Sequence, residues 1–181
     1  QRQMCIRDRA SKTQLAFARQ VYAAAVEAKT EIDPAFVTAQ AMLETGWGAR
    51  VIGKANLFGI TKGSQWDGDI VMVKTHEYFK TPKQKFKEPD RIVSVCKVAG
   101  KNLWYYTVMR AFKDFDSVGD CLKEHERLFQ KPGYKDAWPC RKDPFKFAQK
   151  ICDGVGCKYA TDPTYLTTIT SIIKTIRRKC I

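Results

Sequence analysis

The sequence contains no long hydrophobic run. No stretch approaches the roughly 20 apolar residues that a membrane-spanning helix needs, so no such helix is predicted. The N-terminus also lacks the apolar core of a signal peptide, and its first nine residues, QRQMCIRDR, are polar and charged. We expect residues 1–10 to be a tag, a linker or a disordered extension. Residues 11–181 are long enough for one well-buried domain.

Acidic residues are scarce relative to basic ones. The chain has 32 Lys and Arg against 19 Asp and Glu, a net charge of +13. This excess predicts attraction to an anionic partner, such as nucleic acid, anionic lipid or the acidic bacterial wall. The basic residues are scattered and no common nucleic-acid recognition motif is present, so we expect no nucleic-acid partner.

Histidine is rare, and the number of cysteines is odd. The two histidines are His76 and His125, and the seven cysteines stand at positions 5, 96, 121, 140, 152, 157 and 180. An odd count leaves at least one thiol unpaired in a monomer, which weakens a disulfide framework; a Cys152–Cys157 loop stays open. No second Cys pair or His pair at ligand spacing accompanies these two, so no metal or other cofactor is predicted.

Four longer helices and one short helix are indicated by capping signals and apolar periodicity. Ser11 and Gln14 form a capping box at the start of the first. Asp33 and Pro34 begin a second helix, which should end at Gly46. The third begins at Ser117, where Cys121 and His125 fall on the apolar stripe as a buried thiol and a packing histidine. The fourth runs over residues 163–178, with a shorter helix over 145–151 before it and a loop over 131–142.

Three runs alternate apolar and polar residues with a period of two, which predicts strands. They cover residues 69–79, 91–98 and 103–112, and the sequence AGKN between the last two predicts a hairpin turn. Glu77 falls on the mainly apolar side of the first strand, and His76 on the opposite side. Together these runs predict a small antiparallel sheet.

Glu44 is the strongest catalytic candidate that the residues themselves suggest. At helical spacing it continues the apolar stripe of Val37 and Ala41, so we expect its side chain to point toward the core. A carboxyl group held against apolar surface has a raised pKa and can donate a proton near neutral pH, as a general acid must. The alternative is an ordinary glutamate in the last helical turn, turned outward and solvated.

The order of several motifs resembles one enzyme family. AQAMLETGWG, which contains Glu44, and NLFGI after it are similar to the signature of the glucosaminidase family of peptidoglycan hydrolases, which includes flagellar rod-cap hydrolases, autolysins and phage lysins. THEYF, FKDFDS and YATDPTY follow in the family's order, so the resemblance covers about residues 11–178. One departure is the long segment between THEYF and FKDFDS.

The resemblance implies a fold and an activity. It implies an α+β, mainly α, lysozyme-like domain with a helical body and a small antiparallel β-lobe over residues 70–112, forming one wall of a cleft. It also implies an endo-beta-N-acetylglucosaminidase without cofactor, in which Glu44 is the acid, Glu77 the second carboxylate and Tyr159 the supporting tyrosine. Tyr165 is the competing assignment for that tyrosine, as a substrate contact or a core residue.

Three residues around Glu44 are candidate substrate contacts. Trp47 and Phe58 have aromatic faces that suit stacking on sugar rings, and the amide of Asn56 suits hydroxyl or acetamido groups. Trp47 is equally suited to filling the core behind the helix.

Two other functions remain open at this point. A lytic transglycosylase would use Glu44 alone, and a basic wall-binding module would use no catalytic residue. Under each of these functions, the expected partner is the peptidoglycan glycan strand, and anionic wall polymers or lipopolysaccharide are further expected partners. We expect the protein to be a monomer. The place of action is the bacterial cell wall, for a secreted or periplasmic protein or for a phage lysin.

Overall fold

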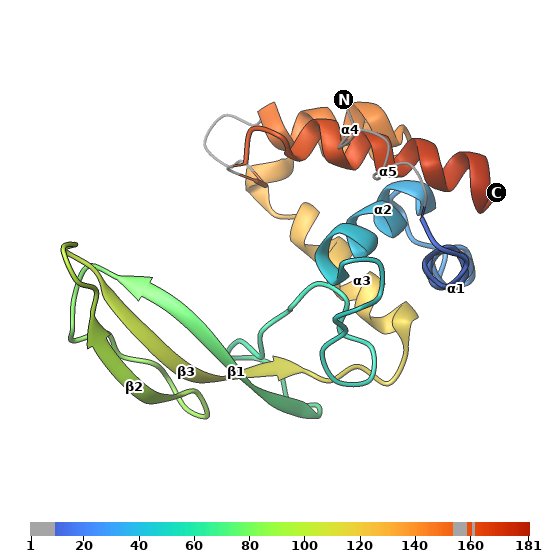
Figure 1. Cartoon of the computed structure of the whole chain (residues 1–181). Helices are drawn as coiled ribbons and strands as arrows, with labels where there is room; N and C mark the ends of the chain where they lie inside the picture. The colour runs from blue at the N-terminus through green and yellow to red at the C-terminus, as the bar shows by residue number, and fades with distance from the viewer. Residues whose placement is uncertain (1–9, 154–158, 161) are drawn as a thin grey trace.

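The fold consists of a helical body and a separate three-stranded lobe (Figure 1). The computed structural model describes residues 10–153, 159, 160 and 162–181. Residues 1–9 of the extension predicted over residues 1–10, and Cys157, lie outside the described residues. The helices of this part are α1 (Lys12–Glu27), α2 (Pro34–Thr45), α3 (Val118–Phe129), α4 (Pro144–Asp153) and α5 (Tyr165–Lys179). The α+β prediction with a mainly helical body is confirmed.

Helix α2 occupies the centre of the body. It packs against α1, α4 and α5, and every residue from Ala35 to Met42 is buried. A helix that is apolar on nearly all sides is stable only when other elements surround it. Among the helices of the described residues, none combines the length and apolar character that crossing a membrane requires.

Local capping fixes both ends of α2, as the sequence predicted. The Asp33 side chain accepts hydrogen bonds from the backbone N–H groups of Ala35 and Phe36, at 2.9 and 3.3 Å. At the other end Gly46 adopts the left-handed conformation with φ of 59°. Trp47 follows with φ of 60°, an unusual conformation for a residue with a side chain, so the chain turns sharply away from the helix.

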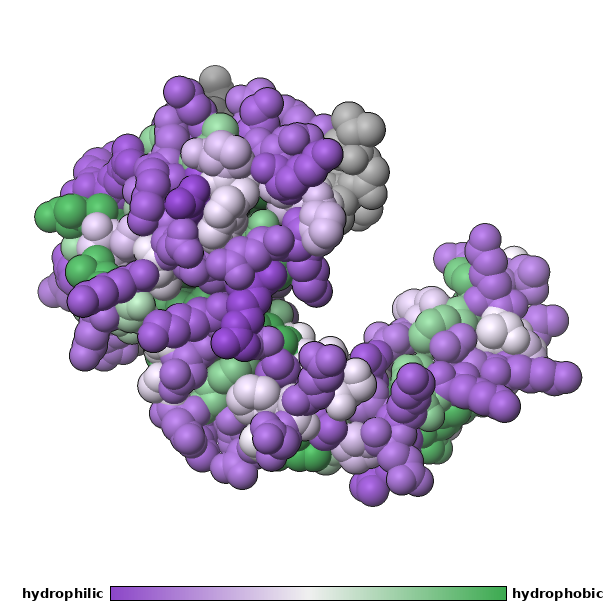
Figure 2. All heavy atoms as spheres, turned by 180° about the vertical axis from the view of Figure 1, so that it is seen from behind, coloured by the Kyte–Doolittle hydropathy of each residue, from purple (hydrophilic) through white to green (hydrophobic). Residues whose placement is uncertain are grey.

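The lobe is an antiparallel sheet made of β1 (Ile70–Phe79), β2 (Arg91–Lys97) and β3 (Trp104–Lys113), in the order β1-β3-β2. The hairpin predicted at residues 99–102 joins β2 to β3, and the predicted strand boundaries hold to within a residue. One sheet face carries its own small core, in which the rings of Phe79, Phe86 and Tyr106 meet at centroid distances of 5.1 to 6.3 Å. The lobe projects to one side of the body, and Figure 2 shows a wide hollow between the two.

Two details differ from the sequence predictions. Residues 131–142 are not a plain loop, because they include two short 3-10 helices, η1 (Pro132–Tyr134) and η2 (Trp138–Cys140). The final helix begins at Tyr165 rather than at Pro163, since the Asp162 side chain accepts hydrogen bonds from Thr164 and holds the preceding turn.

Candidate active site

The prediction that Glu44 points into the core is wrong. Its side chain is exposed, although Ala41 before it and Thr45 after it are buried. The physical reason is that the elements surrounding α2 cover its first two turns, whereas the chain turns away at Gly46 and leaves the last turn at the surface. The acid therefore stands at the open end of a buried helix.

Glu44 nevertheless has the electrostatic property expected of a proton donor. Burial raises the pKa of the Glu44 carboxyl above its usual value, and a hydrogen bond from Tyr159 offsets part of this rise. Exposure and burial are compatible here, because the side chain keeps a solvent-facing surface while neighbouring protein atoms displace part of the water around its carboxylate. This environment favours the protonated carboxyl more than full solvation would, which is the direction that a general acid requires.

Tyr159 lies beside the acid. Its hydroxyl donates to Glu44 Oε1 over 3.5 Å, a long hydrogen bond. Its ring stacks on Phe129, with 5.5 Å between centroids, and lies 5.4 Å from the ring of Tyr165. Burial raises the pKa of the Tyr159 phenol, so it remains a neutral donor. The structure thus brings together two candidates that are 115 positions apart in sequence.

Tyr165 belongs to the core rather than to the open surface. Only 7% of the residue is exposed, and its hydroxyl accepts a hydrogen bond of 2.9 Å from Nε2 of Gln40. Sequence reasoning missed Gln40, which is fully buried one helical turn before Glu44. The sequence signal that could have identified Gln40 is its position four residues before Glu44, which places both residues on the same side of the helix.

The other aromatic and amide candidates divide between site and scaffold. Asn56 is 1% exposed; its amide donates to the carbonyls of Ile60 and Lys113, both at 2.9 Å, and its oxygen accepts from Ile60 N–H. Its amide donors are both used by the backbone, so it holds the corner after α2 and has no donor free for sugar. Phe58 stacks on the ring of His125 at 3.7 Å, and Trp47 is half-buried against the core.

Glu77 is held by neighbours within the lobe. Its Oε1 forms an ion pair with Nη1 of Arg110, whose Nε lies 2.8 Å from Oδ2 of Asp90. Among the described residues, no hydrogen bond or ion pair joins Glu77 to Glu44. The structure therefore places the two predicted carboxylates on body and lobe without bringing them into contact. No sequence pattern indicated Arg110 and Asp90, because Arg110 meets Glu77 only across the folded sheet and Asp90 meets Arg110 from the segment before β2.

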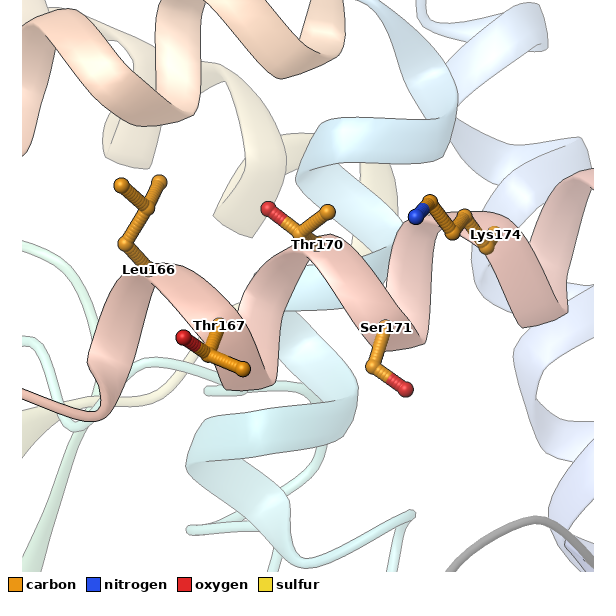
Figure 3. A pocket seen from close by; sticks show the side chains of 5 residues that line it. All are labelled: Leu166, Thr167, Thr170, Ser171 and Lys174. Atoms are coloured by element: carbon orange, nitrogen blue, oxygen red, sulfur yellow. The ribbon is translucent and has the colours of Figure 1, made fainter.

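Surface hollows elsewhere in the described residues do not include Glu44 or Tyr159. The hollow on α5 in Figure 3 is lined by Leu166, Thr167, Thr170, Ser171 and Lys174, with no carboxylate. Another, at the base of the lobe, includes Arg110 and Asp90 but not Glu44. In the described part of the chain, no three side chains gather as metal ligands.

Known proteins similar to this chain include peptidoglycan hydrolases. The family model described as glucosaminidase, mannosyl-glycoprotein endo-beta-N-acetylglucosaminidase, matches residues 20–178. The peptidoglycan hydrolase FlgJ of Vibrio parahaemolyticus is 30% identical over 141 residues, which are 74% of this chain and 37% of that protein. A probable N-acetylmuramidase of Lactococcus lactis subsp. cremoris is 30% identical over 143 residues, 77% of this chain and 28% of the relative. This chain thus spans about a third of each relative's length.

A solved structure shows the same fold. A C-terminally truncated glycoside hydrolase domain of FlgJ from Salmonella typhimurium superposes with a TM-score of 0.65, covering 91% of this chain and 98% of that one. At 22% sequence identity, this likeness concerns the fold alone.

Proposed function

Because this chain belongs to the glucosaminidase family of glycoside hydrolases, we propose that it hydrolyses the glycan strands of peptidoglycan after N-acetylglucosamine, with Glu44 as general acid. The observation that carries this proposal is the Glu44 carboxyl at the open end of α2, with its raised pKa and the Tyr159 hydroxyl beside it. Cleavage of a glycosidic bond requires a carboxylic acid that protonates the leaving oxygen. Burial of the Glu44 carboxyl favours its protonated form, and the net shift of its pKa is upward.

A second group must stabilise the oxocarbenium-like centre or activate water. We assign that role to Glu77, because it lies in the THEYF motif on the lobe that borders the hollow. Its ion pair with Arg110 supports a role as a carboxylate rather than as a proton donor. Tyr159, as a neutral phenol, is suited to hydrogen-bond the acetamido group of the substrate or to orient water. Trp47 and Phe58 remain the proposed sugar contacts.

Two observations support alternative enzymatic activities. The name of the Lactococcus relative, probable N-acetylmuramidase, makes cleavage after N-acetylmuramic acid the alternative bond. The position of Glu44, with Tyr159 as its side-chain hydrogen-bond partner and Glu77 paired with Arg110 in the lobe, also suits a lytic transglycosylase, which uses a single acid and leaves an anhydro end.

The deciding experiment is mass spectrometry of the fragments released from purified peptidoglycan. Reducing-end N-acetylglucosamine supports the proposal, reducing-end N-acetylmuramic acid supports a muramidase, and anhydro ends support a transglycosylase. Glu44→Gln should lower the rate by about 10²–10⁴-fold, because the amide keeps the size of the acid but cannot donate its proton. Glu27→Gln, an exposed glutamate of α1, is the matched control and should keep full activity.

The variants also test the roles of the two carboxylates. A Glu44→Gln protein that retains more than roughly a tenth of wild-type activity contradicts its assignment. If that variant still acts on cells as well as the wild type does, the chain is a non-catalytic wall-binding module. Glu77→Gln should be severely impaired if it activates water, less so if the acetamido group is the nucleophile, and unaffected in a transglycosylase.

The place of action follows from the substrate. We propose that the protein acts as a monomer on the bacterial cell wall, from the secreted or periplasmic side or as a phage lysin. Its net charge of +13 supports further attraction to anionic wall polymers or lipopolysaccharide.

A further inference from the structure

The positive charge of the chain is concentrated in the lobe. Residues 70–113 contain ten Lys and Arg against three Asp and Glu, so this quarter of the sequence carries +7 of the net +13. Two of its three acids, Glu77 and Asp90, face Arg110. In the described structure, eight exposed lobe cations form no ion pair with any carboxylate: Lys74, Lys80, Lys83, Lys85, Lys87, Arg91, Lys97 and Lys101.

Strand β2 adds apolar surface next to these cations. It lies at an edge of the sheet, and all seven of its residues are exposed. Ile92, Val93 and Val95 are 42%, 52% and 37% exposed, which makes β2 the richest source of exposed large apolar side chains among the described elements. Figure 2 shows hydrophobic atoms on the lobe, surrounded by hydrophilic ones. We call β2 together with Lys85, Lys87 and Lys101 the lobe edge.

We propose that the lobe edge binds the surface of an anionic phospholipid membrane. Lysines near such a surface are attracted by its negative potential, while apolar side chains insert between headgroups. A shallow position at headgroup level leaves the free backbone groups of the edge strand in contact with water, as an unpaired strand requires. This proposal does not depend on the catalytic assignment of Glu44.

Charge and apolarity together select the lipid surface over other partners. A second copy pairing along β2 would bring two sets of cations together, including Arg91 and Lys97 at the ends of the strand, and like charges oppose that contact. A hydrophilic polyanion would satisfy the lysines but would leave Ile92, Val93 and Val95 in water. An anionic lipid interface neutralises the cations and removes the apolar side chains from water at the same time.

The test is sedimentation of the full chain with vesicles. We expect binding to vesicles that mix phosphatidylcholine with phosphatidylglycerol and little binding to phosphatidylcholine alone. Lys97→Gln with Lys101→Gln should weaken binding about fivefold per lysine. Val93→Ser with Val95→Ser leaves the charge unchanged and should weaken binding about tenfold. The matched control is Lys150→Gln with Lys174→Gln, two exposed body lysines on α4 and α5, the second visible in Figure 3.

Each outcome decides the proposal. Loss of binding in both lobe variants, with the body control within about twofold of wild type, supports it. An equal loss in the body control means that net charge alone drives binding and overturns it. Unchanged binding by the valine variant also overturns the proposal, because it indicates a site for a polyanion. A wild-type dimer that becomes monomeric in the valine variant overturns it too, because it indicates self-association. Circular dichroism of each variant confirms folding, and cleavage of a short soluble glycan, measured separately, reports the catalytic proposal.

Discussion

His125 has no hydrogen-bond partner for either ring nitrogen among the described residues. It lies in the core, stacked on Phe58 and edge-on to Phe129, which confirms the prediction of a packing histidine. Burial lowers the pKa of its imidazole from 6.5 to about 3, since a charged ring would lose its hydration there without gaining a partner. The ring is therefore held neutral in the folded protein.

This imidazole should make the fold sensitive to acid. Below the unfolded pKa of 6.5, the unfolded chain takes up a proton that the folded chain does not bind until about pH 3. Its contribution to the free energy of unfolding is thus complete above pH 6.5 and falls by about 1.4 kcal/mol per pH unit below it. Urea unfolding at pH 7 and pH 4 should show a smaller loss in His125→Phe than in wild type. Equal losses of unfolding free energy in the two proteins would exclude His125 as the source of the acid sensitivity.

At the scale of elements, the turn after α2 depends on a glycine. Gly48 has φ of +86°, and a Cβ placed on it would lie 2.6 Å from the ring of Phe17 on α1. Gly48→Ala combines an unfavourable backbone conformation with overpacking and should cost about 2–4 kcal/mol. Gly63→Ala, with φ of +65° and open space around it, isolates the backbone cost and should lose about 1 kcal/mol. Thermal unfolding measures both, and equal losses would show that the contact with Phe17 is unimportant.

The elements themselves were largely predictable because their signals are local. Asp33, Pro34 and Gly46 mark both ends of α2, and alternation of side chains marks the strands to within a residue. The direction of Glu44 was not predictable, since it depends on where the surrounding helices end. The burial of Asn56 and the pairing of Glu77 with Arg110 depend on loop path and strand register, which a single sequence does not reveal.

At the scale of the whole molecule, the excess of positive charge should make action on cells depend on salt. Exposed charges are screened over about 8 Å at physiological ionic strength, so lysis of whole cells should fall steeply as salt rises. Cleavage of a short, uncharged chitin-type oligosaccharide, if accepted, should change much less, because local contacts around Glu44 dominate. Parallel curves for the two substrates would mean that the charge of +13 does not contribute to targeting.

The architecture of body and lobe was predictable from the order of motifs, and the relation between the two parts was not. AQAMLETGWG and THEYF indicated a helix and a strand that share a cleft. Their separation is set by the path of residues 46–69, which contain glycines and few regular elements. Sequence patterns describe each part and carry little information about the angle between them.

The small core of the lobe affects how the protein loses activity when it unfolds. Tyr106 is fully buried, donates to the carbonyl of Thr81 and accepts from the N–H of Gln84, so the lobe is tied together by its own rings and bonds. A unit with its own core and ladder can open by local unfolding while the remainder stays folded. When the lobe opens in this way, one wall of the hollow is lost. Catalysis would cease while α2 still presents Glu44 intact.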